Sequence, residues 1–437
     1  MSAGNKVKGH SMQAEQSAGC PYKTAAEIDF MDPLVQENWF DAYDVIRAES
    51  PAYYMPQIGM YVLTRYDDIE YVLRRPIEFT AGPDTGDAEP LLKFPESLAL
   101  YEDKGWRRYT PLGENLPKHA HYRALVEPAL TASAIRAREG FVRATINELI
   151  DDWIDEGQVD FMERFAVPLP MMVIAELLGF PRMDLPQLKE WSSAWVLPFS
   201  RGLSVEQETQ AVNKHIELQH YIFETMQHKR KSPQDDIITR LTQIEMEDVE
   251  LGRKRPLTDT EIIGITDHLL IGGNETTAFA ISNGLWLLFR NPEVYRELQS
   301  DRSKIKGFVE ETLRIESPTQ GLYRFVTEDA EIGGVPVPKG ATLSIRYGAG
   351  NRDPERFPNP EKPQLERKNA GRHLAFGIGE HVCPGATLSR LEQNWAWEIL
   401  LERTDNIRPA PQNDYTHLGG MWVRALNSIH MQFDKVA

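Results

Sequence analysis

The stretch from Thr258 to Arg290 restricts the possible folds of this chain more than any other part of the sequence. Thr258 or Asp259 can cap the start of a helix, and Asn291-Pro292 ends it. A helix of about 33 residues, with a rise of 1.5 Å per residue, spans roughly 50 Å. Its middle and end are apolar on nearly all sides, which predicts a helix buried at the centre of one large domain.

The rest of the sequence predicts a mainly helical protein with a minor share of β-structure. Apolar residues recur at spacings of three and four over 133–155, 161–178, 205–229, 235–243, 303–315 and 386–403, and a shorter helical stretch covers 67–74. Short β-like runs occur at 52–55, 60–64, 330–332, 335–337 and 342–346. Residues 80–116 are rich in proline, glycine and charge, so we expect a long irregular segment there.

We expect residues 1–20 to be a disordered leader and residues 21–437 to form one domain, with a β-rich part at roughly 33–80. The 65 Asp and Glu residues outnumber the 48 Lys and Arg residues, which disfavours nucleic acid as a ligand. No secretory leader and no apolar run of 18 residues is present, which predicts a soluble cytoplasmic protein that does not enter a membrane. Cys20 and Cys383 form neither a disulfide framework nor a Cys-x-x-Cys zinc pattern.

The segment from Phe376 to Ala386 reads Phe-Gly-Ile-Gly-Glu-His-Val-Cys-Pro-Gly-Ala. Glycines permit positive φ angles and let backbone approach a flat ligand closely, and a helix N-terminus stabilises a thiolate. Taken alone, Cys383 is also compatible with a zinc site shared with His381 or with an inert buried thiol.

Two glycines, Gly272 and Gly273, stand at the midpoint of the long helix, where each costs about 1 kcal/mol relative to Ala. Close packing against another helix or a harmless kink would explain them. A kink that opens a groove beside the Glu275 carboxylate and the Thr276 hydroxyl would explain them as well.

Two pairs of charged residues stand at helical spacing. Glu311 and Arg314 lie three apart, and His119 and Arg123 lie four apart. Each pair, taken alone, is most simply an ion pair or a solvated face on a helix surface.

Together these motifs resemble the cytochrome P450 family in order and spacing, from about Pro33 to the end of the chain. The resemblance implies the fold of that family, a triangular prism of about a dozen helices with a long central helix crossing the haem and a small β-sheet region. Ser389 stands where Ala is common in the family, and Asn274 occupies a variable position.

The resemblance also implies a cofactor, haem b, with the Cys383 thiolate as the axial ligand of its iron. Glu275 and Thr276 correspond to the acid and alcohol of the oxygen-activating motif. Glu311 and Arg314 correspond to a pair buried beneath the haem, and Arg356, in the run 354–357, to its third charged member. The remaining contacts to the haem are implied for His119, Arg123, Arg324, Phe376, Gly377, His381 and Gly385.

The implied activity inserts one oxygen atom from O₂ into a small or medium hydrophobic substrate, by C–H hydroxylation or O-dealkylation. Two electrons would come from a ferredoxin or flavodoxin with an NAD(P)H-dependent reductase, and we expect a monomer. A peroxide-driven enzyme of the same fold is the alternative within enzymes, and a non-catalytic haem sensor or carrier is the alternative outside them.

Analogy with the family and the spacing of the motifs also place a substrate pocket. Its expected lining residues are Trp106, Tyr109, Trp195, Phe199, His268, Ile271, Gly272, Thr319, Gln320, Leu322 and Trp422. His268 stands where relatives often carry an aliphatic group. An imidazole there suggests a polar or anionic feature on the substrate, or else a side chain that faces solvent.

Overall fold

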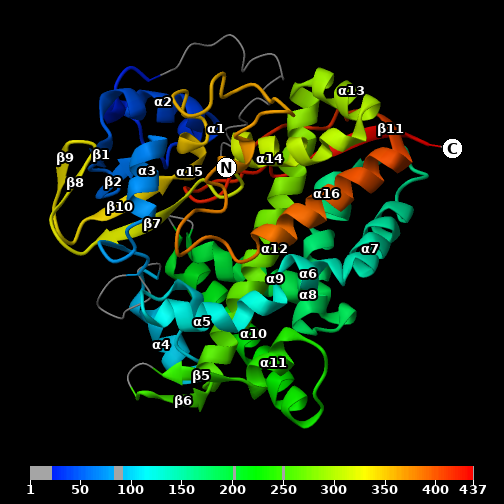
Figure 1. Ribbon diagram of the computed structural model, residues 1–437. Coiled ribbons are helices and arrows are strands. Elements are labelled where there is room, and N and C mark those ends of the chain that lie inside the picture. Colours follow the sequence, from blue (N-terminus) through cyan, green and yellow to red (C-terminus); the bar gives the residue numbers. More distant parts are fainter. Residues whose placement is uncertain (1–21, 83–91, 200–202, 249–250, 437) are drawn as a thin grey trace, which may run out of the picture.

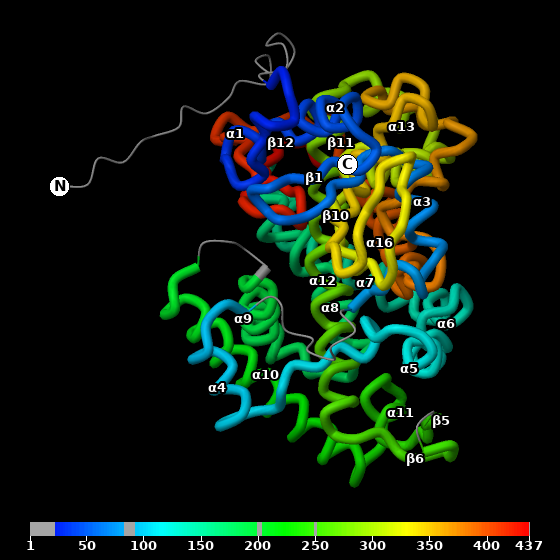
Figure 2. The backbone as a smooth tube through the Cα atoms, turned by 90° about the vertical axis from the view of Figure 1, so that its left-hand side faces the viewer, coloured from blue at the N-terminus to red at the C-terminus, as the bar shows by residue number. Residues whose placement is uncertain are grey.

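Helix α12 (Asp259–Arg290) runs through the centre of the molecule, as two views of the computed structural model show (Figure 1 and Figure 2). The Thr258 hydroxyl accepts the N–H of Glu261 at 3.3 Å, and the Glu261 carboxylate accepts the N–H of Thr258 at 2.7 Å. This reciprocal cap fixes the start of the helix, and Asn291 ends it. Both predicted ends are therefore confirmed.

The structure describes residues 22–82, 92–199, 203–248 and 251–436. The predicted leader, and Cys20 within it, lie outside these ranges. None of the described helices is both long and apolar enough to cross a membrane.

The other helices surround α12, and 55% of the structure is helical, which confirms the predicted fold class. They are α1 (Pro33–Glu37), α2 (Trp39–Glu49), α3 (Tyr66–Leu73), α4 (Pro95–Lys104), α5 (Lys118–Val126), α6 (Ala132–Arg136), α7 (Glu139–Asp151), α8 (Pro168–Leu178), α9 (Leu185–Val196), α10 (Val205–Lys231), α11 (Ile237–Gln243), α13 (Pro292–Ser300), α14 (Ile305–Glu316), α15 (Tyr347–Gly350) and α16 (Ala386–Arg403). In the turned view, α4, α9 and α10 lie on one side of α12, and α5, α6 and α16 lie on the other (Figure 2).

The described strands form small sheets at the periphery. The largest has the order β1 (Ala52–Met55), β2 (Met60–Leu63), β10 (Thr342–Arg346), β7 (Gly321–Val326) and β3 (Phe79–Thr80). A second sheet has the order β11 (Thr404–Pro409), β12 (His430–Lys435) and β4 (Gln158–Asp160), and two strand pairs are β5 (Glu245–Asp248) with β6 (Arg253–Pro256) and β8 (Ala330–Ile332) with β9 (Val335–Val337). Strand β10 pairs parallel with β2 and antiparallel with β7, so the early and late parts of the chain share one sheet.

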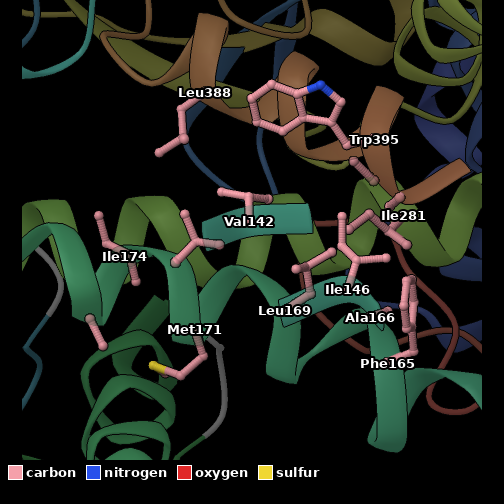
Figure 3. Close-up of a cluster of buried hydrophobic side chains, with 14 of the residues drawn as sticks. Val142, Ile146, Phe165, Ala166, Leu169, Met171, Ile174, Ile281, Leu388 and Trp395 are labelled. Carbon is pink, nitrogen blue, oxygen red and sulfur yellow. The ribbon is translucent and has the colours of Figure 1, made fainter. Parts of the chain in front are cut away.

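A large apolar core joins α12 to its neighbours (Figure 3). Its labelled side chains come from α7, the segment before and within α8, α12 and α16, and include Val142, Ile146, Phe165, Leu169, Ile174, Ile281, Leu388 and Trp395. Full burial of a side chain of this size contributes roughly 1.5–3 kcal/mol. The core therefore fixes α16, and the loop that precedes it, against the middle of α12.

Several predicted boundaries were wrong. The segment 80–116 is not wholly irregular, because it contains α4, whose Tyr101 is buried against α10. The predicted helix 133–155 is two helices, α6 and α7, which are separated at Ala137 and Arg138. The predicted helix 161–178 begins as a π-helix, Met162–Ala166, because Pro168 lacks the N–H that a continuous α-helix requires. Helices α1, α2, α9, α13 and α15 and strands β3, β4, β5, β6, β7, β11 and β12 were also not predicted.

Candidate active site

The loop before α16 places the Cys383 thiol at the start of that helix. Gly377 and Gly379 have φ angles of +64° and +76°, in the left-handed region that glycine adopts without strain. The N–H of Cys383 donates to the carbonyl oxygen of Phe376 at 2.8 Å and closes the loop. The two residues after Pro384, Gly385 and Ala386, direct their N–H groups at the sulfur.

Burial raises the pKa of the Cys383 thiol above its ordinary value. The two N–H groups and the positive charges of Arg123 and Arg390 act in the opposite direction, but they do not outweigh burial. A cation bound at the sulfur would stabilise the thiolate that burial disfavours. The surroundings of this thiol therefore suit a metal centre better than a free nucleophile.

Four of the predicted cofactor residues lie together at the edge of this loop, and we refer to His119, Arg123, Arg324 and His381 as the basic cluster. The His119 and His381 rings lie 4.0 Å apart between centroids. The Arg123 guanidinium donates to the carbonyl oxygen of Val382 at 2.5 Å. Burial, together with the charges of Arg324 and Arg123, lowers the pKa values of both histidines, that of His381 to about 3.

The acids beside the basic cluster are surface residues: the Arg123 guanidinium donates to the Glu127 carboxylate at 2.9 Å, and the Glu127 side chain is 57% exposed. The Glu380 carboxylate, which is 44% exposed, lies 4.0 Å from His119 Nδ1. His119 is buried, and its Nδ1 has no hydrogen-bond partner among the described residues. A buried polar atom without a partner costs free energy, so the geometry suits an anionic ligand that would bind here.

These residues fit haem b. Haem requires one protein ligand for its iron and cations for its two propionates, and Cys383 and the basic cluster supply both. No group of three or more His, Cys, Asp and Glu side chains suited to a metal ion occurs within the described ranges, so a zinc site at His381 and Cys383 would lack further ligands. Gly385 lies close to the Cys383 sulfur, because a Cβ atom built on Gly385 would be 3.8 Å from Sγ.

The two glycines at the midpoint of α12 have different neighbours. A Cβ on Gly273 would lie 2.9 Å from Ile174 Cγ1, so Gly273 permits the close approach of α8. Gly272 is accessible, and a Cβ there would meet nothing nearer than the His268 ring at 4.0 Å. The Thr276 hydroxyl donates to the Gly272 carbonyl oxygen at 2.9 Å. Close packing therefore explains Gly273, while Gly272 leaves the surface of the helix open.

The predicted acid, Glu275, is linked to helix α9. Lys189 Nζ donates to Glu275 Oε1 at 3.0 Å, and the Ser193 hydroxyl lies 3.5 Å from the same oxygen. The Lys189 side chain is 35% exposed, whereas that of Glu275 is 11% exposed. The carboxylate is thus buried next to a cation that reaches solvent. Sequence reasoning missed Lys189 because α9 was not predicted, although Pro186 after Asp184 is a signal for a helix start.

The predicted Glu311–Arg314 pair is present, but its third member is not Arg356. Arg314 donates to both oxygens of the Glu311 carboxylate at 2.7 and 2.9 Å, and neither side chain is exposed. Arg367 Nε donates to the same two oxygens at 3.1 Å. The Arg356 guanidinium instead lies over the Tyr66 ring at 4.6 Å.

A second ion cluster lies beside the Cys383 loop. Arg390 of α16 donates to Glu310 at 2.6 Å, and His373 lies 3.2 Å from the same carboxylate. Burial alone would raise the pKa of Glu310, but the hydrogen bonds from His373 and Arg390 hold it at about 2. The Arg390 guanidinium also lies over the Phe376 ring at 4.5 Å, which connects this cluster to the loop.

The predicted pocket residues have different surroundings. Gln320 was predicted wrongly, because it is fully buried and its amide is engaged by the carbonyl oxygens of Glu316 and Ser317 and by the Tyr43 hydroxyl. The Trp106 ring packs against α10, where Phe223 lies 5.1 Å away.

The remaining pocket residues are distributed over several elements. Tyr109 donates to Tyr122 at 3.2 Å, and Ile271 is buried on α12. Leu322 on β7 is half-buried, and the side chain of Phe199 lies outside what the structure describes. The backbone of Thr319 forms an isolated antiparallel β-bridge with Val423, the residue after Trp422.

Known proteins with similar sequences and structures point to one family. The family model described as Cytochrome P450 matches residues 187–405. The chain is 31% identical to Cytochrome P450 109 of Bacillus spizizenii over 86% of both chains, and 32% identical to 6-deoxyerythronolide B hydroxylase of Saccharopolyspora erythraea over 84% of this chain and 88% of that one. The solved structure of CYP109E1 from Bacillus megaterium in complex with testosterone is similar with a TM-score of 0.79 at 29% identity, covering 92% of this chain and 99% of that one.

Proposed function

The chain belongs to the cytochrome P450 family of monooxygenases, and we propose that it holds haem b through the Cys383 thiolate. The observation that carries this proposal is the convergence of the half-buried Cys383 thiol with the basic cluster. One thiolate is what the iron requires, and a set of cations and imidazoles whose acidic neighbours, Glu127 and Glu380, are exposed suits two propionates.

When bound, the haem supplies the binding of O₂ and its activation by two electrons. The Cys383 thiolate would hold the iron and contribute negative charge to it, while Gly385 and Ala386 orient the sulfur through their N–H groups. The bond from the Thr277 hydroxyl to the Ser389 hydroxyl, 3.1 Å long, ties α12 to α16. This bond fixes Thr276, the neighbour of Thr277, relative to the helix that begins after Cys383.

Thr276 and Glu275 are proposed to deliver protons. The Thr276 hydroxyl now donates to Gly272, and rotation about its side chain would direct the same proton to a ligand lying over the accessible Gly272. The Glu275 carboxylate can exchange protons with solvent next to the partly exposed Lys189. A turn of the Glu275 side chain away from Lys189 would then bring a proton from the surface to the Thr276 side of α12.

We propose hydroxylation or O-dealkylation of a small or medium hydrophobic molecule as the reaction. The hydroxylase of 6-deoxyerythronolide B and the testosterone complex among the similar proteins support this substrate class. We also propose that a ferredoxin or flavodoxin, reduced by an NAD(P)H-dependent reductase, supplies the two electrons.

The test compares oxidation of a hydrophobic compound library by the holoenzyme with a ferredoxin and its reductase, and with hydrogen peroxide alone. Product in the first assay supports the proposal, product only with peroxide indicates a peroxygenase, and no product in either indicates a sensor or carrier. Thr276→Ala should consume electrons without forming product, whereas Thr276→Ser, which keeps the hydroxyl, should stay coupled. Unchanged coupling in the alanine variant would contradict the role given to Thr276.

A further inference from the structure

His268 lies on the face of α12 that carries Gly272 and Thr276. The three positions are spaced by four residues, so they form one row along the helix. The His268 Cδ2 atom is the nearest side-chain atom to the missing Cβ of Gly272, at 4.0 Å. Eight residues of helix separate His268 from Thr276, a rise of about 12 Å.

The two ring nitrogens of His268 differ in their surroundings. Nδ1 is inaccessible and has no hydrogen-bond partner among the described residues. Nε2, which is bonded to the Cδ2 atom beside Gly272, is not among the buried atoms that lack a partner, and His268 as a whole is partly accessible. The Nε2 edge therefore opens onto the row that contains Gly272 and Thr276.

The burial of Nδ1 determines which nitrogen carries the proton. A buried N–H without a partner is rarer and less tolerable than a buried lone pair without one. The neutral ring is therefore best described with its proton on Nε2. Burial lowers the pKa of His268 to about 4, so the ring is neutral near pH 7 and offers one donor, Nε2–H.

Charges of both signs lie next to His268. Asp267, the preceding residue, accepts hydrogen bonds from Trp195 Nε1 at 2.9 Å and from His215 Nε2 at 2.7 Å. The buried Arg108 guanidinium lies 3.7 Å above the Trp195 ring. Arg108 disfavours a cationic ligand here and Asp267 disfavours an anionic one, which leaves an uncharged group.

We propose that His268 donates a hydrogen bond from Nε2 to an uncharged acceptor oxygen of the substrate, such as a ketone or ester carbonyl. His268 would thereby select elongated molecules that carry this oxygen about 12 Å from the carbon oxidised beside Thr276. This inference rests on the proposed function, because it takes Thr276 as the end of the site at which oxidation occurs.

The test measures dissociation constants of the holoenzyme by the low-to-high-spin shift that ligand binding produces. The probes are 4-acetyl-4′-ethylbiphenyl, its isostere with an isopropenyl group in place of the acetyl group, and the corresponding biphenyl carboxylate. The native protein should bind the ketone roughly tenfold more tightly than the isostere. His268→Phe should abolish this preference, and His268→Gln, which keeps a donor, should retain part of it. Thr266→Val, a change at a buried position off the row, should leave the preference intact.

Any of four results would overturn the inference. The native protein would bind the ketone and the isostere with equal dissociation constants, would show no spin shift with any probe, or would bind the carboxylate more tightly than the ketone. In the fourth, His268→Phe would keep the preference for the ketone unchanged. The thiolate-type spectrum of the reduced carbonyl complex is recorded for every variant. A native protein that lacks this spectrum refutes the proposed function, whereas a normal spectrum with no preference for the ketone refutes the role of His268 alone.

Discussion

Replacement of Arg367 by Met should lower the free energy of unfolding by about 3–5 kcal/mol, because it removes one of two cations from the buried Glu311 carboxylate. The side chains of Glu311 and Arg314 are 0% exposed, and that of Arg367 is 4% exposed. Arg367 also donates to three carbonyl oxygens in the loop 358–362. Arg367→Met also removes the hydrogen bonds that connect the loop 358–362, through Arg367, to Glu311 of α14. We therefore expect a loss of stability in the upper part of the range of about 3–5 kcal/mol.

The assay is urea unfolding of the holoprotein, followed by tryptophan fluorescence and by retention of haem. Arg356→Met is the matched control, because it removes the same side chain eleven positions earlier. The Arg356 guanidinium contacts the Tyr66 ring and not Glu311, and such a contact is worth about 1 kcal/mol. A Glu311→Gln background should reduce the cost of Arg367→Met, because the charge that Arg367 neutralises is absent there.

Equal losses of stability in the two arginine variants would refute this reasoning, since the two guanidinium groups have different partners. A cost of Arg367→Met that is the same in the native protein and in the Glu311→Gln background would refute it as well. In that case the loop carbonyls, and not the carboxylate, would determine the importance of Arg367.

Four further substitutions test other parts of the structure. Burial raises the pKa of Glu392 in the folded state to about 8, from an ordinary value of 4.5. Between these two pH values the carboxyl group is ionised in the unfolded protein but protonated in the folded one, so a rise in pH lowers the free energy of unfolding. Glu392→Gln should therefore stabilise the protein by up to about 3 kcal/mol at pH 7 and have no such effect near pH 4, as measured by urea unfolding at both values. The pKa of Glu310 is held at about 2, so its contribution is complete above pH 4.5 and is lost as the pH falls toward 2. Glu310→Gln should cost more at pH 7 than at pH 3, and equal costs would argue against the cluster. Gly273→Ala should destabilise the protein by about 1–3 kcal/mol, because its Cβ would crowd Ile174, whereas Gly272→Ala should not destabilise it. Thermal unfolding of the two variants measures this difference. A lower melting temperature for Gly272→Ala than for Gly273→Ala would contradict it.

The parts of the fold that the sequence predicted well are those specified by local signals. Thr258 caps α12, and Asn291 followed by Pro292 ends it, so both bounds were found. Helix α16 and strands β8, β9 and β10 also begin and end where expected. In each case the glycines, prolines and capping residues that set the ends are neighbours in the sequence.

The features that were missed depend on contacts between distant segments. Arg356 and Arg367 both lie in the irregular stretch between α15 and α16, and no local pattern decides which of them turns toward Glu311. Gln320 was expected in the pocket, but its amide satisfies backbone carbonyls at the end of α14. Polar residues in irregular segments find their partners only when the tertiary structure forms, so sequence position alone is a weak guide to their roles.

The glycine pair of α12 shows why a motif can have two causes. Successive residues of a helix point about 100° apart, so Gly272 and Gly273 meet different neighbours. Gly273 turns toward α8, where Ile174 leaves no room for a Cβ, while Gly272 turns toward the accessible row with His268 and Thr276. Packing explains Gly273 but not Gly272, whose accessible surface is available to the ligand that we propose. Because the close approach of α8 fixes the rotation of α12 about its axis, Gly273 also determines which residues line the row, and a substitution at Gly273 should therefore alter ligand binding without touching the ligand.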